Sequence, residues 1–383
     1  WIASASIQHK QFKINEFKFH IWIQGECCLD WDYILTDFEK FAVEQINDFK
    51  SFPVPEYHFL YQILPFEAYH GVEHTSNTVI SLGPGYKIMK KPLYDSFLGV
   101  SSHELYHTWN VKKIRPKAFM PYDYSKENYS RMGFLYEGVT SYMGDLYLRR
   151  SGVFSTKQFF ICQEKNLDKH FHNEGRYNKS IADSSFDTWL DGYVVGIPNR
   201  KVSIYTEGSL CALMLDLSIL KKTNGELSLR DLMTRLYYQY AMKNIGLTEE
   251  DYILELIKYG GGTAKEIIEN HMYGTLDYRV LLDRLLSCVG LNIIEQDNDD
   301  FFAMKMGMKT FFVNKSLQIS HVLIGSLADN AKISVGDRIL EVNKQKITKK
   351  LLVSLKKEDS ISIKLKRRFK SVDLKIYLDD QIT

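Results

Sequence analysis

Two histidines and a glutamate in residues 101–116 have the types and the spacing needed for chemistry at a metal ion. The stretch reads SSHELYHTWNVKKIRP and contains His103, Glu104 and His107, an H-E-x-x-H pattern. On a helix, residues i and i+4 lie on the same face, so both imidazoles can reach one ion. Glu104 lies one position along, where its carboxylate can take a proton from metal-bound water. The alternative is an amphipathic helix whose histidines only hydrogen-bond to neighbours.

A further carboxylate supports the metal-site interpretation. Glu137 lies in residues 133–148, GFLYEGVTSYMGDLYL, near the start of a second helical pattern. Catalytic zinc takes three protein ligands and keeps a fourth position for water, and two histidines with one glutamate form a recurrent set. A glutamate that opens a helix packed against the first helix can supply this third ligand. We therefore expect His103, His107 and Glu137 to hold one Zn²⁺ ion.

Composition excludes several other classes of function. The chain has 383 residues, of which 45% are hydrophobic and 25% charged, as in an ordinary globular protein. Its net charge of +2 gives no reason to expect nucleic acid as a partner. The five cysteines are not arranged as a disulfide framework, which favours the cytoplasm. No apolar run is long enough for a membrane span, and the start resembles no signal peptide, so the chain is expected to begin inside a domain.

Hydrophobic periodicity predicts the elements that must position these residues. The period of a strand appears at residues 12–23, 57–64 and 78–82, and helical spacing appears at residues 30–49. The metal-motif helix is expected at 93–109, and the helix that carries Glu137 at 132–150. Residues 69–75, YHGVEHT, favour a surface turn with Glu73 exposed. Residues 165–201 look irregular, and their histidines, His170 and His172, are interpreted as surface residues.

The rest of the chain is predicted to be helical and then β-rich. Helices are expected at 205–220, 229–242, 248–259, 263–271 and 277–289, the second with Ser228 and Asp231 as a capping pair. After about residue 295 the pattern alternates, at 301–313 and 319–323, with a short helix at 326–332 and two strands within 360–378. The fold class is therefore α+β. We divide the chain into a β-rich region at 1–90, a helical catalytic domain at 91–294 and a small β-rich domain at 295–383.

Several of these stretches together resemble a known family. They are GVEHTS at 71–76, HELYHTWNVKKIRP at 103–116, YEGVTSYMGDLYL at 136–148 and YTEGSLCALMLDL at 205–217. This set is similar to the glycyl aminopeptidase family of gluzincin metallopeptidases, which combine a thermolysin-like catalytic domain with a C-terminal PDZ domain. The tail, VLIGSLADNAKISVGDRILEVN at 322–343, resembles part of a PDZ domain but shows no glycine-rich carboxylate loop. From the resemblance we expect the family's N-terminal β-domain to be largely absent from this sequence.

The resemblance implies a role for each matching residue. His103, His107 and Glu137 match the zinc ligands, and Glu104 matches the general base. Tyr205 takes the place of a tyrosine that steadies the oxyanion in the related membrane alanyl aminopeptidases, where a Glu-Lys-Gly stretch follows; here Thr206, Glu207 and Gly208 follow. The alternative for Tyr205 is a core tyrosine at a helix start.

The same relatives imply a docking point for the substrate. Glu73 falls where they carry a Gly-x-Met-Glu-Asn segment; here Gly71, Val72, Glu73 and His74 retain a glycine and the glutamate, while Met and Asn are replaced. A carboxylate at this point can pair with the α-ammonium of a peptide, because charge-assisted hydrogen bonds in a desolvated site are strong.

These residues and the resemblance lead to one expected activity and two rivals. We expect a zinc-dependent aminopeptidase that removes N-terminal residues, with Gly or Ala suggested by the family, from peptides with a free N-terminus. The PDZ-like domain is expected to take a peptide or protein ligand. The rivals are an inactive scaffold or chaperone-like protein that binds peptides through the PDZ-like domain, and a metalloendopeptidase. Glu73 distinguishes the aminopeptidase from the endopeptidase, and intact metal ligands argue against the scaffold.

Overall fold

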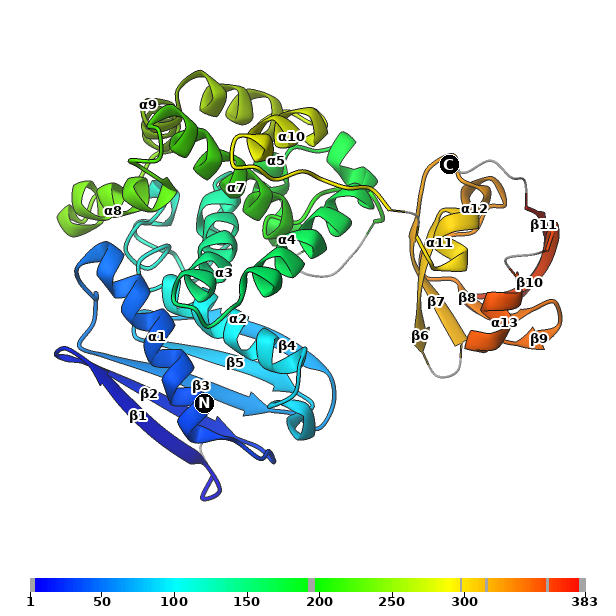
Figure 1. Cartoon of the computed structure of the whole chain (residues 1–383), viewed down its shortest axis with the longest axis horizontal. Helices are drawn as coiled ribbons and strands as arrows, with labels where there is room; N and C mark the ends of the chain where they lie inside the picture. Colours follow the sequence, from blue (N-terminus) through cyan, green and yellow to red (C-terminus); the bar gives the residue numbers. More distant parts are fainter. Residues whose placement is uncertain (1–3, 192–196, 297, 314–315, 356–357, 379–383) are drawn as a thin grey trace. The chain divides into compact units, whose positions relative to one another are not determined.

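The chain forms two compact units. The structure is a computed structural model and describes residues 4–191, 197–296, 298–313, 316–355 and 358–378. The larger unit contains nearly all residues up to Leu291, and the smaller begins at Asn292 and also includes the short segments Phe171–Gly175 and Ile197–Asn199. Figure 1 shows a sheet and a set of helices in the first unit and a β-rich second unit. The predicted α+β class is confirmed.

A mixed sheet forms the N-terminal part of the larger unit. Within the described residues its strand order is β1-β2-β3-β5-β4. The strands are β1 (Gln8–Ile14), β2 (Phe17–Gln24), β3 (Glu56–Ile63), β4 (Ala68–Glu73) and β5 (Asn77–Gly83). β2, β3 and β5 are parallel, whereas β1 and β4 pair antiparallel at the two edges. Alternate side chains of the three central strands are buried, as a period of two predicts.

Two predictions in this region are wrong. The single strand expected at 12–23 is a hairpin, because Asn15 adopts a φ of 53° and reverses the chain between β1 and β2. Asparagine tolerates this left-handed conformation better than most residues. The turn expected at 69–75 is mostly the edge strand β4, which pairs with β5 from Ala68 to Glu73. Glu73 is consequently held at the end of a strand instead of on a free loop.

Two helices cover the same face of this sheet. α1 (Trp31–Phe49) begins where Asp30 accepts a hydrogen bond from the Tyr33 amide at 3.1 Å, an N-cap that contributes about 1 kcal/mol. It packs on the sheet through contacts such as the edge-to-face pair of Phe38 and Phe59. α2 (Leu93–Tyr106) lies on the same face, where the Tyr57 hydroxyl donates to the Glu104 carbonyl at 3.1 Å. The sheet therefore supports the helix that carries the H-E-x-x-H pattern.

The central region is helical, as predicted. Its main helices are α3 (Thr140–Arg150), α4 (Thr156–Phe171), α5 (Ile181–Phe186), α6 (Thr188–Asp191), α7 (Thr206–Lys222), α8 (Leu229–Gln239), α9 (Glu249–Ile267) and α10 (Arg279–Ser287). Two π-helical turns, Phe134–Val139 and Ile268–Met272, precede α3 and follow α9. Short 3-10 turns lie at Gly85–Lys87, Lys117–Phe119, Glu174–Tyr177 and Ala241–Lys243.

The helix boundaries show both confirmed and wrong predictions. The capping box of Ser228 and Asp231 is present at the start of α8, as predicted. The irregular region expected at 165–201 instead begins inside α4 and contains α5 and α6. The break expected between the helices at 248–259 and 263–271 is confirmed, because Gly261 has a φ of 68° and divides α9 into two helical parts. Such a φ suits glycine, which lacks a Cβ.

The smaller unit is an antiparallel sheet with short helices. Its elements are α11 (Phe301–Met306), β6 (Met308–Val313), β7 (Ser316–Val322), α12 (Leu327–Asn330), β8 (Arg338–Val342), β9 (Gln345–Lys346), α13 (Lys349–Ser354), β10 (Ser360–Arg367) and β11 (Lys370–Tyr377). The strand order is β11-β10-β8-β7-β6, with β9 beside β8. The strand pattern expected at 301–313 is wrong in its first half: Phe301–Met306 is a helix capped by Asp300, and Phe301, Phe302 and Met306 bury their side chains in this unit's core.

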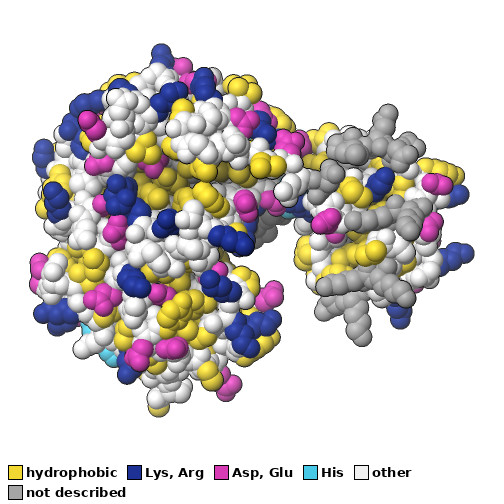
Figure 2. All heavy atoms as spheres, viewed as in Figure 1, with side chains coloured by type: hydrophobic (Ala, Val, Ile, Leu, Met, Phe, Trp, Pro, Cys, Tyr) yellow, Lys and Arg dark blue, Asp and Glu magenta, His cyan; other side chains and the backbone are white. Residues whose placement is uncertain are grey.

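The surface carries charges of both signs. Figure 2 shows Lys and Arg interspersed with Asp and Glu over the visible face of the larger unit. This mixture agrees with the small net charge of +2. Among the described helices, none combines the length and the apolar character needed to cross a bilayer.

Candidate metal centre and active-site cleft

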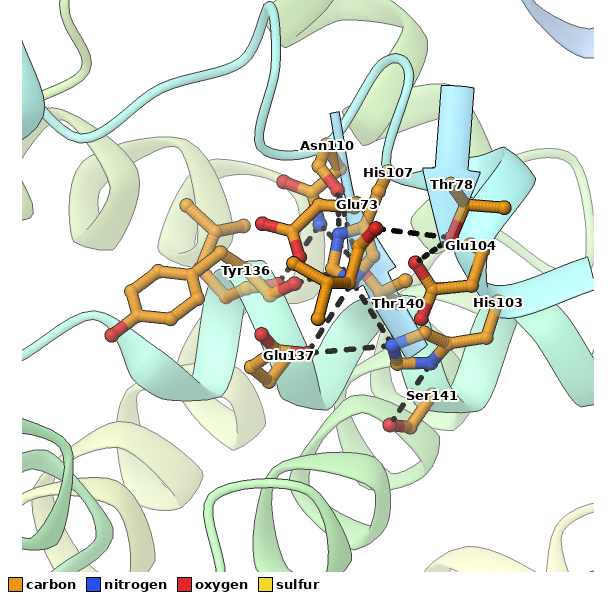
Figure 3. A network of polar contacts seen from close by, with 12 residues as sticks. Glu73, Thr78, His103, Glu104, His107, Asn110, Tyr136, Glu137, Thr140 and Ser141 are labelled. Carbon is orange, nitrogen blue, oxygen red and sulfur yellow. Dashed lines mark hydrogen bonds and ion pairs between the residues drawn. The ribbon is translucent and has the colours of Figure 1, made fainter. Parts of the chain in front are cut away.

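Three potential metal ligands converge at the end of α2. The Nε2 atoms of His103 and His107 are 3.0 Å apart, and Glu137 Oε2 lies 3.4 Å from each of them. Figure 3 shows the two imidazoles and the carboxylate pointing toward one another. With zinc bonds of about 2.0 to 2.1 Å, the ligand atoms of a tetrahedral site are separated by roughly 3.3 Å. The three atoms therefore fit a single tetrahedral zinc ion, and Glu137 Oε2 is buried without a hydrogen-bond donor.

His107 lies just beyond the helix that was predicted to contain it. α2 ends at Tyr106, three residues earlier than expected, and His107 is its C-cap. The backbone then turns so that His107 Nδ1 contacts the Asn110 carbonyl oxygen at 2.7 Å. With Nδ1 carrying the hydrogen, Nε2 keeps its lone pair for the metal, which is the usual arrangement for a ligating histidine. The Asn110 amide in turn donates to the Leu135 carbonyl at 2.9 Å.

Glu137 sits in a π-helical turn. Residues Phe134–Val139 are π-helical, and regular α-helix resumes at Thr140. Such turns insert one residue into a helix and occur frequently at functional sites. The turn is held by Asn110, which contacts both the Leu135 carbonyl and Thr140 Oγ1. It also packs tightly against α7, because a Cβ on Gly138 would meet the Gly208 Cα at 2.4 Å.

Glu104 is buried next to the metal ligands. Thr78 Oγ1, on β5, donates to Glu104 Oε2 at 2.9 Å. Gly71, on the edge strand β4, makes room for the other oxygen, because a Cβ at this position would lie 2.2 Å from Glu104 Oε1. Burial raises the pKa of Glu104 above its ordinary value, although His107, His103 and the Thr78 hydrogen bond act in the opposite direction. A raised pKa suits a carboxylate that must accept a proton near neutral pH.

Glu73 lies on the same side of the site and has a cationic neighbour. Lys112 Nζ is 3.1 Å from Glu73 Oε1. Burial would raise the pKa of Glu73, but the charges of His107 and Lys112 outweigh it and lower the pKa below the ordinary value. Glu73 is therefore ionised at neutral pH, as a partner for an ammonium group must be. It is only a quarter exposed, so the expected exposed carboxylate is instead partly enclosed.

Tyr205 lies at the start of α7 and lines the same cleft. Its ring centroid is 6.3 Å from that of His103, with the two rings nearly stacked. The cleft has a volume of about 370 Å³, and its lining includes Gly71, Glu73, Glu104, Glu137, Asp145 and Tyr205. The structure thus brings the expected metal ligands, Glu104, Tyr205, Gly71 and Glu73 to one cleft.

The histidine at the end of α4 corrects a prediction. His170 was expected on the surface but is fully buried, and its Nδ1 lies 2.7 Å from Glu207 Oε2. Glu207 is the residue that replaces the lysine of the Glu-Lys-Gly stretch in the relatives. The buried carboxylate therefore has a partner in His170, which the sequence pattern did not reveal. His172 is half-buried.

The protonation of the metal-free ligands follows from their proximity. Burial lowers the pKa of His107, but the Glu137 carboxylate dominates together with Glu73 and Glu104, and the pKa rises to about 9. Burial raises the pKa of Glu137, but the neighbouring His107 and His103 lower it to about 2. Without metal, a protonated His107 therefore faces an ionised Glu137 at neutral pH. Zinc must displace this proton, because only neutral imidazole nitrogen binds metal.

A second group of potential ligands is less suited to a metal. Within the described residues, His20, Glu56 and His58 also place ligand atoms within 4.8 Å of one another. However, Lys18 already contacts Glu56 at 2.8 Å, and Trp22 Nε1 donates to His58 Nδ1 at 3.2 Å. The closest His20 to Glu56 distance is 4.0 Å, which exceeds the spacing in a tetrahedral site.

Three residues that shape the site were missed in the sequence. Asn110 and Lys112 lie in the same stretch as the H-E-x-x-H pattern, HTWNVK, so their proximity in the chain was a usable signal. Thr78 gave no such signal, because it reaches Glu104 only through the pairing of β5 with its neighbours.

Comparisons with known proteins give family matches for two stretches of the chain and similar folds among solved structures. Residues 96–211 match the family of the M61 glycyl aminopeptidases, and residues 280–366 match the PDZ domain. A crystal structure of an aminopeptidase N family protein from Idiomarina loihiensis superimposes with a TM-score of 0.88 and 26% identity, over 97% of this chain and 67% of that one. An M1 zinc metallopeptidase from Deinococcus radiodurans gives a TM-score of 0.46 and 11% identity, over 71% of this chain and 53% of that one. A search of curated proteins found no significant match.

Proposed function

We propose that this chain, of which residues 96–211 match the M61 glycyl aminopeptidases and residues 280–366 match the PDZ domain, is a zinc-dependent metallopeptidase that removes N-terminal residues from peptides. The observation that carries this proposal is the convergence of His103, His107 and Glu137 at tetrahedral spacing with Glu104 buried beside them. One zinc ion would be held by these three ligands. Gly or Ala as the residue removed follows from the family alone.

Each residue has a defined part in the proposed reaction. Bound zinc supplies a Lewis acid that polarises the scissile carbonyl and lowers the pKa of water to about 7. Glu104 accepts the proton of the attacking water and passes it to the leaving amine. Thr78 holds Oε2 of Glu104, which leaves Oε1 to take the proton. The Tyr205 hydroxyl donates to the developing oxyanion, a form of preorganised stabilisation that is often the largest catalytic contribution.

Glu73 directs the reaction to the end of the peptide. Its carboxylate is ionised and partly enclosed in the cleft beside Glu137. We propose that it binds the free α-ammonium of the substrate, and that Lys112 keeps the carboxylate charged and in place. Removal of the substrate's positive charge would leave Glu73 without this partner in a partly desolvated site.

The roles of the two units follow from this assignment. We propose that residues 1–90 and 91–294 are the β-rich and helical parts of the catalytic domain, and that residues 295–383 form the PDZ-like domain. This domain would bind a peptide or protein ligand.

The variant Glu104→Gln tests the base. Glutamine keeps the shape of the side chain and the hydrogen bond from Thr78 but accepts no proton. We expect a loss of at least about 10²-fold in kcat, with the zinc content unchanged, because general-base catalysis commonly contributes 10²- to 10⁴-fold. Glu226→Gln is the matched control, because Glu226 is an exposed residue between α7 and α8. Full activity of the Glu104 variant would exclude this residue as the base.

A pair of substrates tests the ammonium site. A dipeptide amide with a free N-terminus should be cleaved, and its N-acetylated form should not. Glu73→Gln should raise KM for the free substrate while the zinc content stays the same. Equal cleavage of the two substrates by the wild type would instead indicate an endopeptidase, and the absence of bound zinc would favour the scaffold.

A further inference from the structure

A buried hydrogen-bonded pair supports the first turn of α7. His170 at the end of α4 and Glu207 near the start of α7 are 0% and 2% exposed, and their side chains are 2.7 Å apart. The His170 ring is also stacked on Tyr278, with a centroid distance of 4.3 Å. Its orientation is therefore set from two sides. A buried pair of this kind costs free energy to desolvate, and removal of one partner leaves the other without its hydrogen bond.

The first turn of α7 is linked to the metal site in two ways, through Tyr205 and through the residue that follows Glu137. Tyr205 precedes Glu207 by two residues, and its carbonyl accepts a hydrogen bond from the Ser209 amide at 2.9 Å. On the next residue, Gly208, an added Cβ would lie 2.5 Å from the Gly138 Cα. Gly138 directly follows the metal ligand Glu137. A displacement of this turn would consequently move Tyr205 and press on the π-helical turn that carries Glu137.

We propose that His170 and Glu207 are positioning residues that hold the first turn of α7, and with it Tyr205, at the working distance from the metal site. This inference rests on the proposed aminopeptidase function and on the role of Tyr205 in it. Neither His170 nor Glu207 touches the reacting atoms. If their effect on the reaction passes through Tyr205 alone, it cannot exceed the effect of removing the Tyr205 hydroxyl itself.

The rest of α7 is held by a separate hydrogen bond. Its contribution to stability can therefore be tested apart from the effect of the first turn on activity. Further along the helix, the Tyr142 hydroxyl donates to Asp216 Oδ2 at 2.6 Å, and Asp216 Oδ1 accepts the Leu229 amide at 2.7 Å. Tyr142 and Asp216 are both nearly fully buried. Loss of the Tyr142 hydrogen bond should therefore reduce stability without moving the first turn.

The central test compares His170→Phe with Tyr142→Phe. Phenylalanine at 170 keeps a ring against Tyr278 but removes the donor to Glu207. We expect a 10- to 100-fold loss of kcat with a change in KM of less than about threefold and an unchanged zinc content, because a displacement of about 1 Å can cost 10²-fold. His170→Asn, which retains an N–H donor near the position of Nδ1, should restore kcat to within about threefold. Tyr142→Phe should lower Tm but leave kcat within about twofold.

A double-mutant cycle shows whether the effect passes through Tyr205. If it does, His170→Phe should cost nothing further in a Tyr205→Phe background, because the two changes remove the same contribution. Independent, multiplicative losses would overturn the proposal. So would equal losses of kcat in the His170→Phe and Tyr142→Phe variants.

Hydrogen exchange provides a readout that does not depend on activity. In His170→Phe, amides in the first turn of α7, from Thr206 to Ser209, should exchange faster than in the wild type, and in Tyr142→Phe they should not. Unchanged exchange in this turn would overturn the proposal whatever the activity. If His170→Phe does not fold, Glu207→Gln serves in its place, because glutamine keeps an acceptor but removes the charge. This variant should show a smaller effect of the same kind, and wild-type activity together with wild-type exchange would overturn the proposal. Full activity of Tyr205→Phe, by contrast, would contradict the proposed role of Tyr205 itself.

Discussion

The contact between Gly71 and Glu104 allows the proposed base to be displaced without changing any metal ligand. In Gly71→Ala, the new Cβ would lie 2.2 Å from Glu104 Oε1, whereas an ordinary contact is at least 3.4 Å. Glu104 must therefore move by roughly 1 Å, because its carboxylate is the flexible partner and Gly71 is held in the pairing of β4 with β5. The same movement strains the hydrogen bond that Thr78 donates to Oε2.

The size of the effect follows from this displacement. A misplacement of about 1 Å can cost 10²-fold in rate, and loss of general-base catalysis costs 10²- to 10⁴-fold. We expect kcat to fall by about 10²-fold, with Tm nearly unchanged, because alanine is compatible with an extended strand and slightly reduces the entropy of the unfolded chain. The zinc content should stay the same, since the three heavy atoms nearest to the added methyl group all belong to Glu104 and none to a metal ligand.

The assay measures kcat and KM on a dipeptide amide, zinc content by elemental analysis, and Tm. Gly262→Ala is the matched control, because a Cβ on Gly262 would meet nothing within 4 Å. The control should keep wild-type activity and metal. Two results would refute the reasoning: a Gly71→Ala enzyme within threefold of the wild type, or a loss of activity that is accompanied by loss of zinc.

Two further predictions concern the charge of the site. Thr78→Val removes the hydrogen bond that lowers the pKa of Glu104, so the acidic limb of the kcat/KM profile should move to higher pH. The pH dependence of activity measures this shift, and an unchanged profile would show that Thr78 does not act on the base. In the metal-free protein the pKa of His107 is about 9, so zinc uptake at pH 7 should release about one proton, and this release should vanish above pH 9. Calorimetry in buffers of different ionisation enthalpy measures the release, and zinc uptake without it at pH 7 would contradict the assigned charge state.

The metal-site geometry was predictable because it depends on short-range spacing. His103 and His107 are four residues apart, and a helix places such residues on one face whatever surrounds it. The exact end of α2 was less predictable, because the apolar pattern continues through Trp109 while the backbone turns at His107 to reach Asn110. Periodicity reports which side chains are buried, but it does not distinguish the last helical turn from a compact loop.

The contacts that sequence reasoning missed join residues far apart in the chain. His170 and Glu207 are 37 residues apart, and Thr78 and Glu104 are 26 apart. Nothing in the local pattern of either partner indicates the other, so a lone polar residue was interpreted as exposed. The Phe301–Met306 helix was missed for another reason: six residues are too few to distinguish a short apolar helix from an alternating strand.

The π-helical turn makes the position of Glu137 depend on chain length. An α-helix turns by about 100° for each residue, and the wider turn at Phe134–Val139 accommodates one additional residue before the regular helix begins. Deleting a single residue here would let the segment wind as a continuous α-helix and would rotate Glu137 away from the two imidazoles. Length changes in this turn should therefore be far less acceptable than side-chain substitutions, and a protein engineer who redesigns the site must preserve the number of residues in Phe134–Val139.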